Sequence, residues 1–295
     1  MDRTVKLWNL ATGRCTQTLK GHADWVRSVA WSRESGYLAS GSDDQTIKIW
    51  QTGAGICIMT LTGHTAAVYS VAWAPHDSDT SRFLASGAAD RTIKLWDTAR
   101  LWDRARRECM STLKGHTASV GSVAWSPKAG KLLASGADDG TIKIWNTAIA
   151  ECTSTLRNGS GKVLSVAWSP DGTRLDCALA SDGIQLWDPA TCQLIARLHG
   201  RTNLTFSVAW SHDGTRLASG WAGGNIEIWD PTARDFIGIL QGGTSHIFSV
   251  AWAGDGTLAC GQGSSTLQIW YPATRRCIST LKGHTDSVLS VAWLY

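Results

Sequence analysis

The 295-residue sequence lacks several features that mark common protein classes. No apolar run approaches the roughly 18 residues that a transmembrane helix needs, and residues 1–6 lack the apolar stretch of a signal peptide. The sequence also lacks a large excess of charge of either sign, because 28 Lys and Arg stand against 24 Asp and Glu, a net charge of +4. We therefore expect a partner that is neither nucleic acid nor a membrane.

The sequence also lacks the short motifs of common enzyme classes. It contains no GxSxG nucleophile turn, no phosphate-binding P-loop and no HExxH zinc site. No pair of carboxylates or positioned nucleophile replaces them. We therefore expect a protein that is not an enzyme, with no catalytic residues, no metal and no cofactor.

Tryptophan is abundant although the other large aromatics are scarce: 17 Trp stand against 4 Phe and 4 Tyr. Fourteen of these Trp fall in two columns with a period of about 42 residues. One column ends the repeated string SVAW, at Trp31, Trp73, Trp125, Trp168, Trp210, Trp252 and Trp293. The other ends strings close to TIKIW, at Trp8, Trp50, Trp96, Trp145, Trp187, Trp229 and Trp270. Such periodicity indicates a repeat architecture.

Each repeat predicts four short β-strands. The runs VRSVAW, LASGS, TIKIW and CIMTL, here named strands a, b, c and d, are apolar or β-branched and are separated by Gly, Asp and Ser. Strands a to c are apolar or small on both faces, so each sheet must be covered on both sides. Sheets stacked radially around an axis satisfy that need, and about 42 residues with four strands is the period of a propeller blade.

The repeats resemble the Trp-Asp (WD) repeat β-propellers. Gly-His pairs stand at 21–22, 63–64, 115–116 and 283–284, and Trp-Asp closes strand c at 96–97, 187–188 and 229–230. The Asp of that dipeptide is replaced by Asn9, Gln51, Asn146 and Tyr271. The units also resemble the repeat arrays of multidomain sensor proteins of fungi and bacteria.

The resemblance implies a buried hydrogen-bonded set of His, Ser, Asp and Trp in each blade. Three complete sets are present: His22/Ser40/Asp44/Trp50, His64/Ser86/Asp90/Trp96 and His116/Ser135/Asp139/Trp145. His284, Asp2 and Trp8 form a fourth without its Ser. In the other three repeats His and Asp are lost together, as expected where a half-satisfied buried network would be costly. Histidines in separate blades cannot converge on one metal ion, so we assign them a structural role.

The two ends of the chain share the last blade of the predicted ring. We expect an all-β, seven-bladed propeller formed by one domain, residues 1–295, whose closing blade combines residues 1–20 with 283–295 and lacks strand b. Three outcomes are open there: a gap, an inward shift of strand c to pair with strand a, or a strand borrowed from another chain. We expect a monomer, with an edge-strand dimer as the alternative.

The cysteines follow the repeat and not a disulfide framework. Cys15, Cys57, Cys152 and Cys277 each lie seven residues after a strand-c Trp. Equivalent strands of different blades are too far apart for a disulfide bridge. Free thiols in this number indicate a reducing compartment, and we expect the protein to be cytoplasmic.

One rim of the propeller is the predicted binding surface. The d–a and b–c loops emerge on the same side, and they carry Trp25 and Trp221, two of the Trp outside the columns. Lys162, Arg201 and His246 lie on that rim in the blades without the network. Trp is enriched at binding hot spots, although packing of Trp25 and Trp221 on neighbouring loops is equally compatible with the sequence.

The resemblance implies a non-enzymatic scaffold or sensor module that binds a protein or peptide on this rim. The alternative is a propeller that binds a small ligand or glycan, with Trp25 or Trp221 as a stacking platform.

Overall fold

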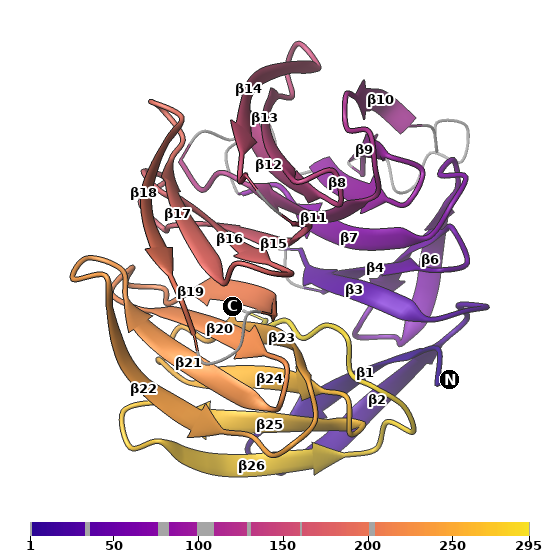
Figure 1. Ribbon diagram of the computed structural model, residues 1–295. Coiled ribbons are helices and arrows are strands. Elements are labelled where there is room, and N and C mark those ends of the chain that lie inside the picture. Colours follow the sequence, from indigo (N-terminus) through magenta and orange to yellow (C-terminus); the bar gives the residue numbers. More distant parts are fainter. Residues whose placement is uncertain are drawn as a thin grey trace.

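The computed structural model describes residues 2–32, 36–75, 83–98, 109–128, 131–159, 161–200 and 204–294. These residues form six four-stranded antiparallel sheets and one two-stranded sheet. The sheets stand around a central axis like the blades of a propeller, in the order of the sequence (Figure 1). No helix in the described ranges is long and apolar enough to cross a bilayer.

Each sheet is one blade, with strand a innermost and strand d outermost. Blade 1 comprises β3 Val26–Trp31, β4 Tyr37–Ser42, β5 Ile47–Gln51 and β6 Ile56–Leu61. Blade 2 comprises β7 Val68–Trp73, β8 Phe83–Ala88, β9 Thr92–Asp97 and β10 Cys109–Lys114. Blade 3 comprises β11 Val120–Trp125, β12 Leu132–Ala137, β13 Thr141–Asn146 and β14 Glu151–Arg157.

The second half repeats the same order. Blade 4 comprises β15 Val163–Trp168, β16 Leu175–Leu179, β17 Ile184–Asp188 and β18 Gln193–Leu198. Blade 5 comprises β19 Thr205–Trp210, β20 Leu217–Trp221, β21 Asn225–Asp230 and β22 Asp235–Gln241. Blade 6 comprises β23 Ile247–Trp252, β24 Leu258–Gln262, β25 Thr266–Tyr271 and β26 Arg276–Lys282. The two-stranded sheet pairs β1 Thr4–Asn9 with β2 Arg14–Lys20.

The blades pack through small residues on strand b and aliphatic residues on the next strand a. Gly136 of β12 lies so close to blade 4 that a Cβ there would come within 2.3 Å of Val163 Cγ1. Gly41 and Gly87 have the same relation to the Val of the following blade, at 2.7 Å. The core consequently consists of separate clusters, one between each pair of neighbouring blades. Glycine is favoured at this position in blades 1 to 3 because the aliphatic side chain of the next blade occupies the space that its side chain would fill, whereas blade 4 has Ala178 there.

The inner strands are joined into a ring by one repeated hydrogen bond. In every SVAW string the Val amide donates to the Ser Oγ of the preceding string, at 3.1–3.4 Å. The seventh string takes part, because Val291 donates to Ser249 and Val29 donates to Ser290. The C-terminal segment, residues 287–294, therefore lies between β23 and β3 and closes the ring.

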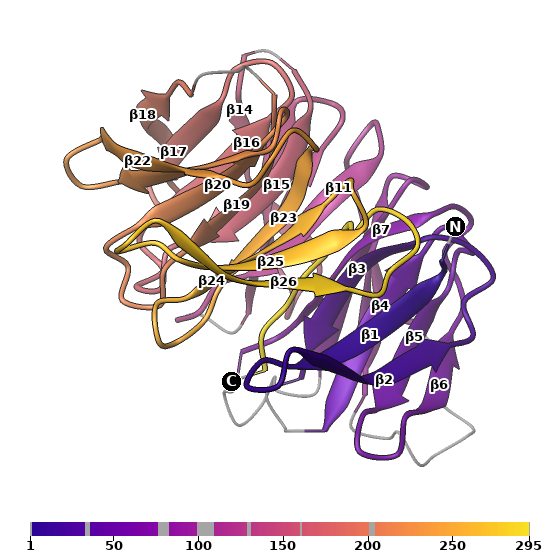
Figure 2. The same ribbon diagram turned by 90° about the horizontal axis from the view of Figure 1, so that it is seen from below.

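The prediction of seven blades is wrong: six blades form. At the seventh position, which we call the closing position, β1 and β2 lie between blade 6 and blade 1 (Figure 2). The C-terminal segment lies near the axis, carries no β-strand and pairs with neither β1 nor β2. The physical reason is the missing strand b, because a ladder between inner and outer strands needs that strand as its middle member. Of the three outcomes considered, the structure shows the gap.

Candidate functional site

The d–a and b–c loops meet along one edge of the propeller, which we call the rim. In each blade a backbone amide of the b–c turn donates to a carbonyl of the d–a loop. Asp43 N donates to Trp25 O in blade 1, and Gly263 N donates to His246 O in blade 6, at 2.9 and 3.0 Å. The equivalent bonds in blades 2 to 5 are 2.8–3.2 Å long. The loops that carry the predicted binding residues therefore share one surface.

The three complete polar sets form hydrogen-bonded chains just beneath the rim. In blade 1, Trp50 Nε1 donates to Ser40 Oγ at 2.8 Å. Ser40 Oγ lies 2.7 Å from His22 Nε2, and His22 Nδ1 lies 2.8 Å from Asp44 Oδ2. Because Ser40 accepts from the indole, its hydroxyl donates to the imidazole, whose Nδ1–H donates to the carboxylate.

Ser86 of β8 holds the same central place in blade 2. Trp96 Nε1 donates to Ser86 Oγ at 2.8 Å, and Ser86 Oγ lies 2.8 Å from His64 Nε2. His64 Nδ1 in turn lies 2.7 Å from Asp90 Oδ2. Blade 3 repeats the chain at 2.7–3.0 Å with Trp145, Ser135, His116 and Asp139. The three hydroxyl-bearing residues, Ser40, Ser86 and Ser135, are 0% exposed, so they hold the blade together and are not available to a partner.

The histidines of these sets are held in the neutral form. Burial lowers the pKa of His22, and the hydrogen bond and charge of Asp44 only partly offset that effect. Burial would raise the pKa of Asp44, yet hydrogen bonds from Thr46, the Ala23 amide and His22 hold it at about 2. The sets therefore fix the d–a loop on the b–c turn. No group of three or more His, Cys, Asp or Glu in the described ranges could hold a metal ion.

The blades without the complete set use other polar contacts in its place. In blade 4, Gln185 Nε2 donates to Asn158 O and to Asp182 Oδ2. In blade 6, Gln262 Nε2 donates to Gly242 O and to Gln268 Oε1, both at 2.8 Å. The sequence pattern did not indicate these replacements, because the glutamines come from different strands of the blade: Gln185 from strand c and Gln262 from strand b.

Trp221 in blade 5 is an interior residue, so its expected place on an exposed rim is wrong. Its side chain is 1% exposed, and its Nε1 donates to Ser219 Oγ at 2.6 Å. Trp229 Nε1 donates to the same hydroxyl at 2.9 Å. Trp221 thus occupies the partner position that an imidazole holds in blades 1 to 3. Packing, the alternative weighed from the sequence, is what the structure shows.

Trp25 lies on the rim and is half-buried. The Arg27 guanidinium carbon lies 4.6 Å from the centroid of its ring and 5.7 Å from that of Tyr69. Arg27 is held there by two hydrogen bonds to Asp43, at 2.8 and 2.6 Å. One face of the Trp25 indole is therefore covered by a cation.

The remaining predicted residues are spread around the rim. Lys162 is exposed and pairs with Asp138 of blade 3 at 2.8 Å. His246 is exposed and accepts a hydrogen bond from Gly223 N at 3.3 Å. Arg201 lies outside the described residues.

The structure adds rim residues that the sequence reasoning missed. Phe206 and Phe248, which were not predicted, form a cluster with the predicted His246, with ring centroids 5.1–5.9 Å apart. Phe206, Phe248, Arg27 and Tyr69 all occupy the variable position x of the string V-x-S-V-A-W and its variants. The residue at position x varies from repeat to repeat while the rest of the string is nearly constant. That variability was the signal in the sequence that could have identified these residues.

Comparison with known proteins agrees with this geometry. The family model described as the IFT122 first beta-propeller matches residues 97–295, and the model of the WD domain, G-beta repeat, matches residues 13–51 and 55–97.

Among curated proteins, nuclear distribution protein PAC1 of Arthroderma otae is 29% identical over 153 residues, 48% of this chain and 33% of that protein. PAC1 of Coccidioides posadasii is 46% identical over 43 residues, 15% of this chain and 9% of that protein. A lissencephaly-1 homolog of Heterostelium pallidum is 54% identical over 39 residues, 13% of this chain and 9% of that protein. The chain thus spans a third or less of the length of these relatives. With its repeated Trp columns, radial blades and buried polar sets, the chain belongs to the WD-repeat β-propeller family.

Proposed function

We propose that this propeller is a non-enzymatic interaction scaffold that docks a protein or peptide segment on its rim. The observation that carries the proposal is the cluster of Phe206, His246 and Phe248, whose side chains are half-buried or exposed at the end of the inner strands. Aromatic side chains that keep one face toward solvent supply large contact area at low entropic cost. The kinship to nuclear distribution and lissencephaly-1 proteins is consistent with a scaffold role.

The rim also carries charged side chains. Arg27 lies among Trp25, Tyr69 and Asp43, and Lys162 extends into solvent from its pair with Asp138. A surface ion pair of this kind contributes little to stability, so a partner carboxylate could displace it at low cost. The combination favours an extended peptide with apolar and acidic side chains.

No observation favours the glycan-binding alternative. Trp221 is buried, and Arg27 covers a face of Trp25, so neither indole presents an open platform. We further propose that residues 1–295 act as one monomeric domain, with residues 1–20 and 283–295 sharing the closing position. The eight free thiols support a cytoplasmic location, because thiols stay reduced in that compartment.

Selection of a random-peptide display library against the immobilised protein tests the rim. We expect selected peptides whose affinity falls at least about tenfold on Phe206→Ala or His246→Ala, because truncation of an interface aromatic commonly costs about 1–2 kcal/mol or more. Ile278→Ala is the control, since Ile278 is 58% exposed on the outer strand β26. Thermal denaturation checks that the variants are folded. Peptides that bind all variants equally, or a selection that yields no binder, would contradict the proposal.

A further inference from the structure

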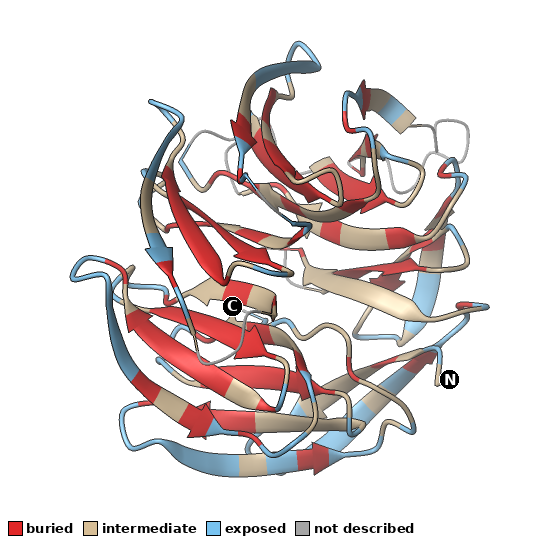
Figure 3. Ribbon diagram, viewed as in Figure 1, coloured by how far each residue is buried: buried red, intermediate tan, exposed pale blue. Residues whose placement is uncertain are grey.

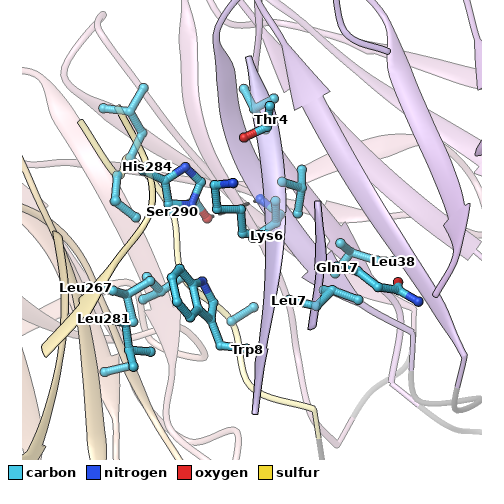
Figure 4. A pocket seen from close by; sticks show the side chains of 18 of the residues that line it. Thr4, Lys6, Leu7, Trp8, Gln17, Leu38, Leu267, Leu281, His284 and Ser290 are labelled. Carbon is cyan, nitrogen blue, oxygen red and sulfur yellow. Dashed lines mark hydrogen bonds between the residues drawn. The ribbon is translucent and has the colours of Figure 1, made fainter. Parts of the chain in front are cut away.

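The closing position contains a cavity of about 900 Å³. It lies between β1 and the C-terminal segment, and its side walls come from blade 1 and blade 6. Figure 4 shows Trp8 directed toward Leu267 and Leu281 of blade 6, whereas Leu7 is directed to the opposite side, where Leu38 of blade 1 lies. The cavity therefore has the place that strand b occupies in a complete blade.

Every other element of a blade is already present around this cavity. The C-terminal segment makes the contacts of a strand a: Trp293 Nε1 donates to Ala251 O, as Trp73 Nε1 donates to Ala30 O. Val288 packs on Gly261, whose Cβ would come within 2.9 Å of Val288 Cγ1. β1 pairs with β2 as strand c pairs with strand d. Among the described residues, only strand b has no counterpart at the closing position.

The missing strand leaves apolar side chains uncovered on both walls. In β7, β11, β15, β19 and β23 the first and fourth residues are buried, but β3 is intermediate along its whole length (Figure 3). Val26 and Val29 are the β3 residues concerned, and both line the cavity. On the side of blade 6, Leu267 of β25 lines the cavity and is half-buried, whereas its equivalent Ile47 in β5 is buried. The two walls are continuous with the interfaces that neighbouring blades form elsewhere.

A polar partner is missing at the same place. Trp8 Nε1 is buried and has no hydrogen-bond partner among the described residues. His284 Nδ1 is bonded to Asp2, as in the complete sets, and Gly283 packs on Trp8 as Gly21 packs on Trp50. In the complete sets the indole donates to the strand-b Ser hydroxyl. The cavity thus lacks a hydroxyl at one defined position.

We propose that the closing position accepts an extended segment of a partner polypeptide with the pattern Leu-Ala-Ser-Gly, which completes the blade as its strand b. The segment would pair antiparallel with β1 and with the C-terminal segment, an addition of a strand to exposed sheet edges. Its Ser would accept from Trp8 Nε1 and donate to His284 Nε2. Its Gly would face Val26, because a Cβ at the equivalent Gly41 would come within 2.7 Å of Val68.

A second copy of this chain is a poor donor. Its strands with this pattern are the middle strands of complete blades, paired on both sides and buried. Releasing one would unfold a blade. The occupant is therefore a segment that is unpaired in its own chain.

Titration with a synthetic peptide tests the proposal. The peptide reproduces residues 131–138, KLLASGAD, which contain strand β12. We expect saturable, equimolar binding by calorimetry and a rise in Tm. A peptide with Gly136→Leu should bind at least about tenfold more weakly, because the added side chain overlaps Val26. A peptide with Ser135→Ala should bind about fivefold more weakly, the effect of one buried hydrogen bond.

Two variants of the protein test the same proposal. Val26→Trp fills the cavity and should abolish peptide binding, whereas Phe206→Ala on the rim should leave it unchanged. The rim proposal can therefore fail without affecting this one. Absence of binding, equal binding of the three peptides, or retained binding by Val26→Trp would overturn the proposal. Loss of peptide binding on Phe206→Ala would place the peptide on the rim and overturn it as well.

Discussion

Replacement of Trp145 by alanine is expected to lower the free energy of unfolding by about 3–5 kcal/mol, the range for truncating a large buried aromatic. Trp145 is 1% exposed in the cluster between blades 2 and 3, and its Nε1 donates to Ser135 Oγ. The change therefore opens a cavity and removes a hydrogen bond from a buried set. Denaturant titration followed by circular dichroism measures the effect.

Two further variants separate packing from hydrogen bonding. Trp145→Phe keeps most of the ring but loses the N–H, so we expect a smaller loss, about 1–3 kcal/mol. Ile149→Ala, at a residue that is 59% exposed, should change stability by no more than about 0.5 kcal/mol. If Trp145→Ala lowered the free energy of unfolding no more than Ile149→Ala, the repeated Trp side chains would not stabilise the packing between blades.

Acidification from pH 8 to pH 3 is expected to destabilise the protein progressively. The pKa of each histidine in the four His–Asp pairs is lowered from 6.5 by burial. The unfolded chain therefore takes up protons first, and stability falls as pH decreases below about 6.5. The paired Asp pKa values are also lowered from 3.8, to about 2 at Asp44 and Asp139. Their contribution is present above pH 3.8 and is lost as pH falls toward 2.

Asp176 opposes this trend. Its carboxyl is fully buried in β16, and burial raises its pKa well above 3.8. The folded state therefore retains this proton while the unfolded chain loses it, and the contribution of Asp176 to stability decreases as pH rises. One such group acts against four His–Asp pairs, so we expect a net loss of stability on acidification.

Free energies of unfolding measured at intervals between pH 8 and pH 3 check this prediction. Asp139→Asn retains a hydrogen-bond acceptor but removes the titrating group, so its profile should be flatter below about pH 4. We expect Asp44 and Asp139, whose pKa values are lowered, to contribute about 1–2 kcal/mol each to the free energy of unfolding after allowance for solvent screening. A profile that is level from pH 8 to pH 4, or that rises on acidification, would show that the pairs do not stabilise the folded state as described.

The repeated strings determined most of the local structure. Strands a to d were predictable because short apolar or β-branched runs and the turn residues that bound them act within a few positions of the chain. The three complete polar sets were predictable from the resemblance to WD-repeat propellers. In each set the Asp follows the Ser by four residues and the Trp follows the Asp by six, and a partial set would leave buried groups unsatisfied.

The tertiary structure decided which side chains are available to a partner. Trp25 and Trp221 were both expected on the rim, yet only Trp221 is fully buried. Its burial depends on the space left by the missing imidazole of blade 5, which no local pattern records. The cluster of Phe206, His246 and Phe248 likewise forms only because blades 5 and 6 bring separate repeats together.

The number of blades also depended on the closure of the ring. The sequence by itself showed seven inner strings and the absence of one strand b. Only the structure showed that the C-terminal segment joins the ring of inner hydrogen bonds while β1 and β2 remain a separate sheet. A sheet needs a continuous ladder of backbone hydrogen bonds, and residues from opposite ends of the chain cannot form one across a missing strand.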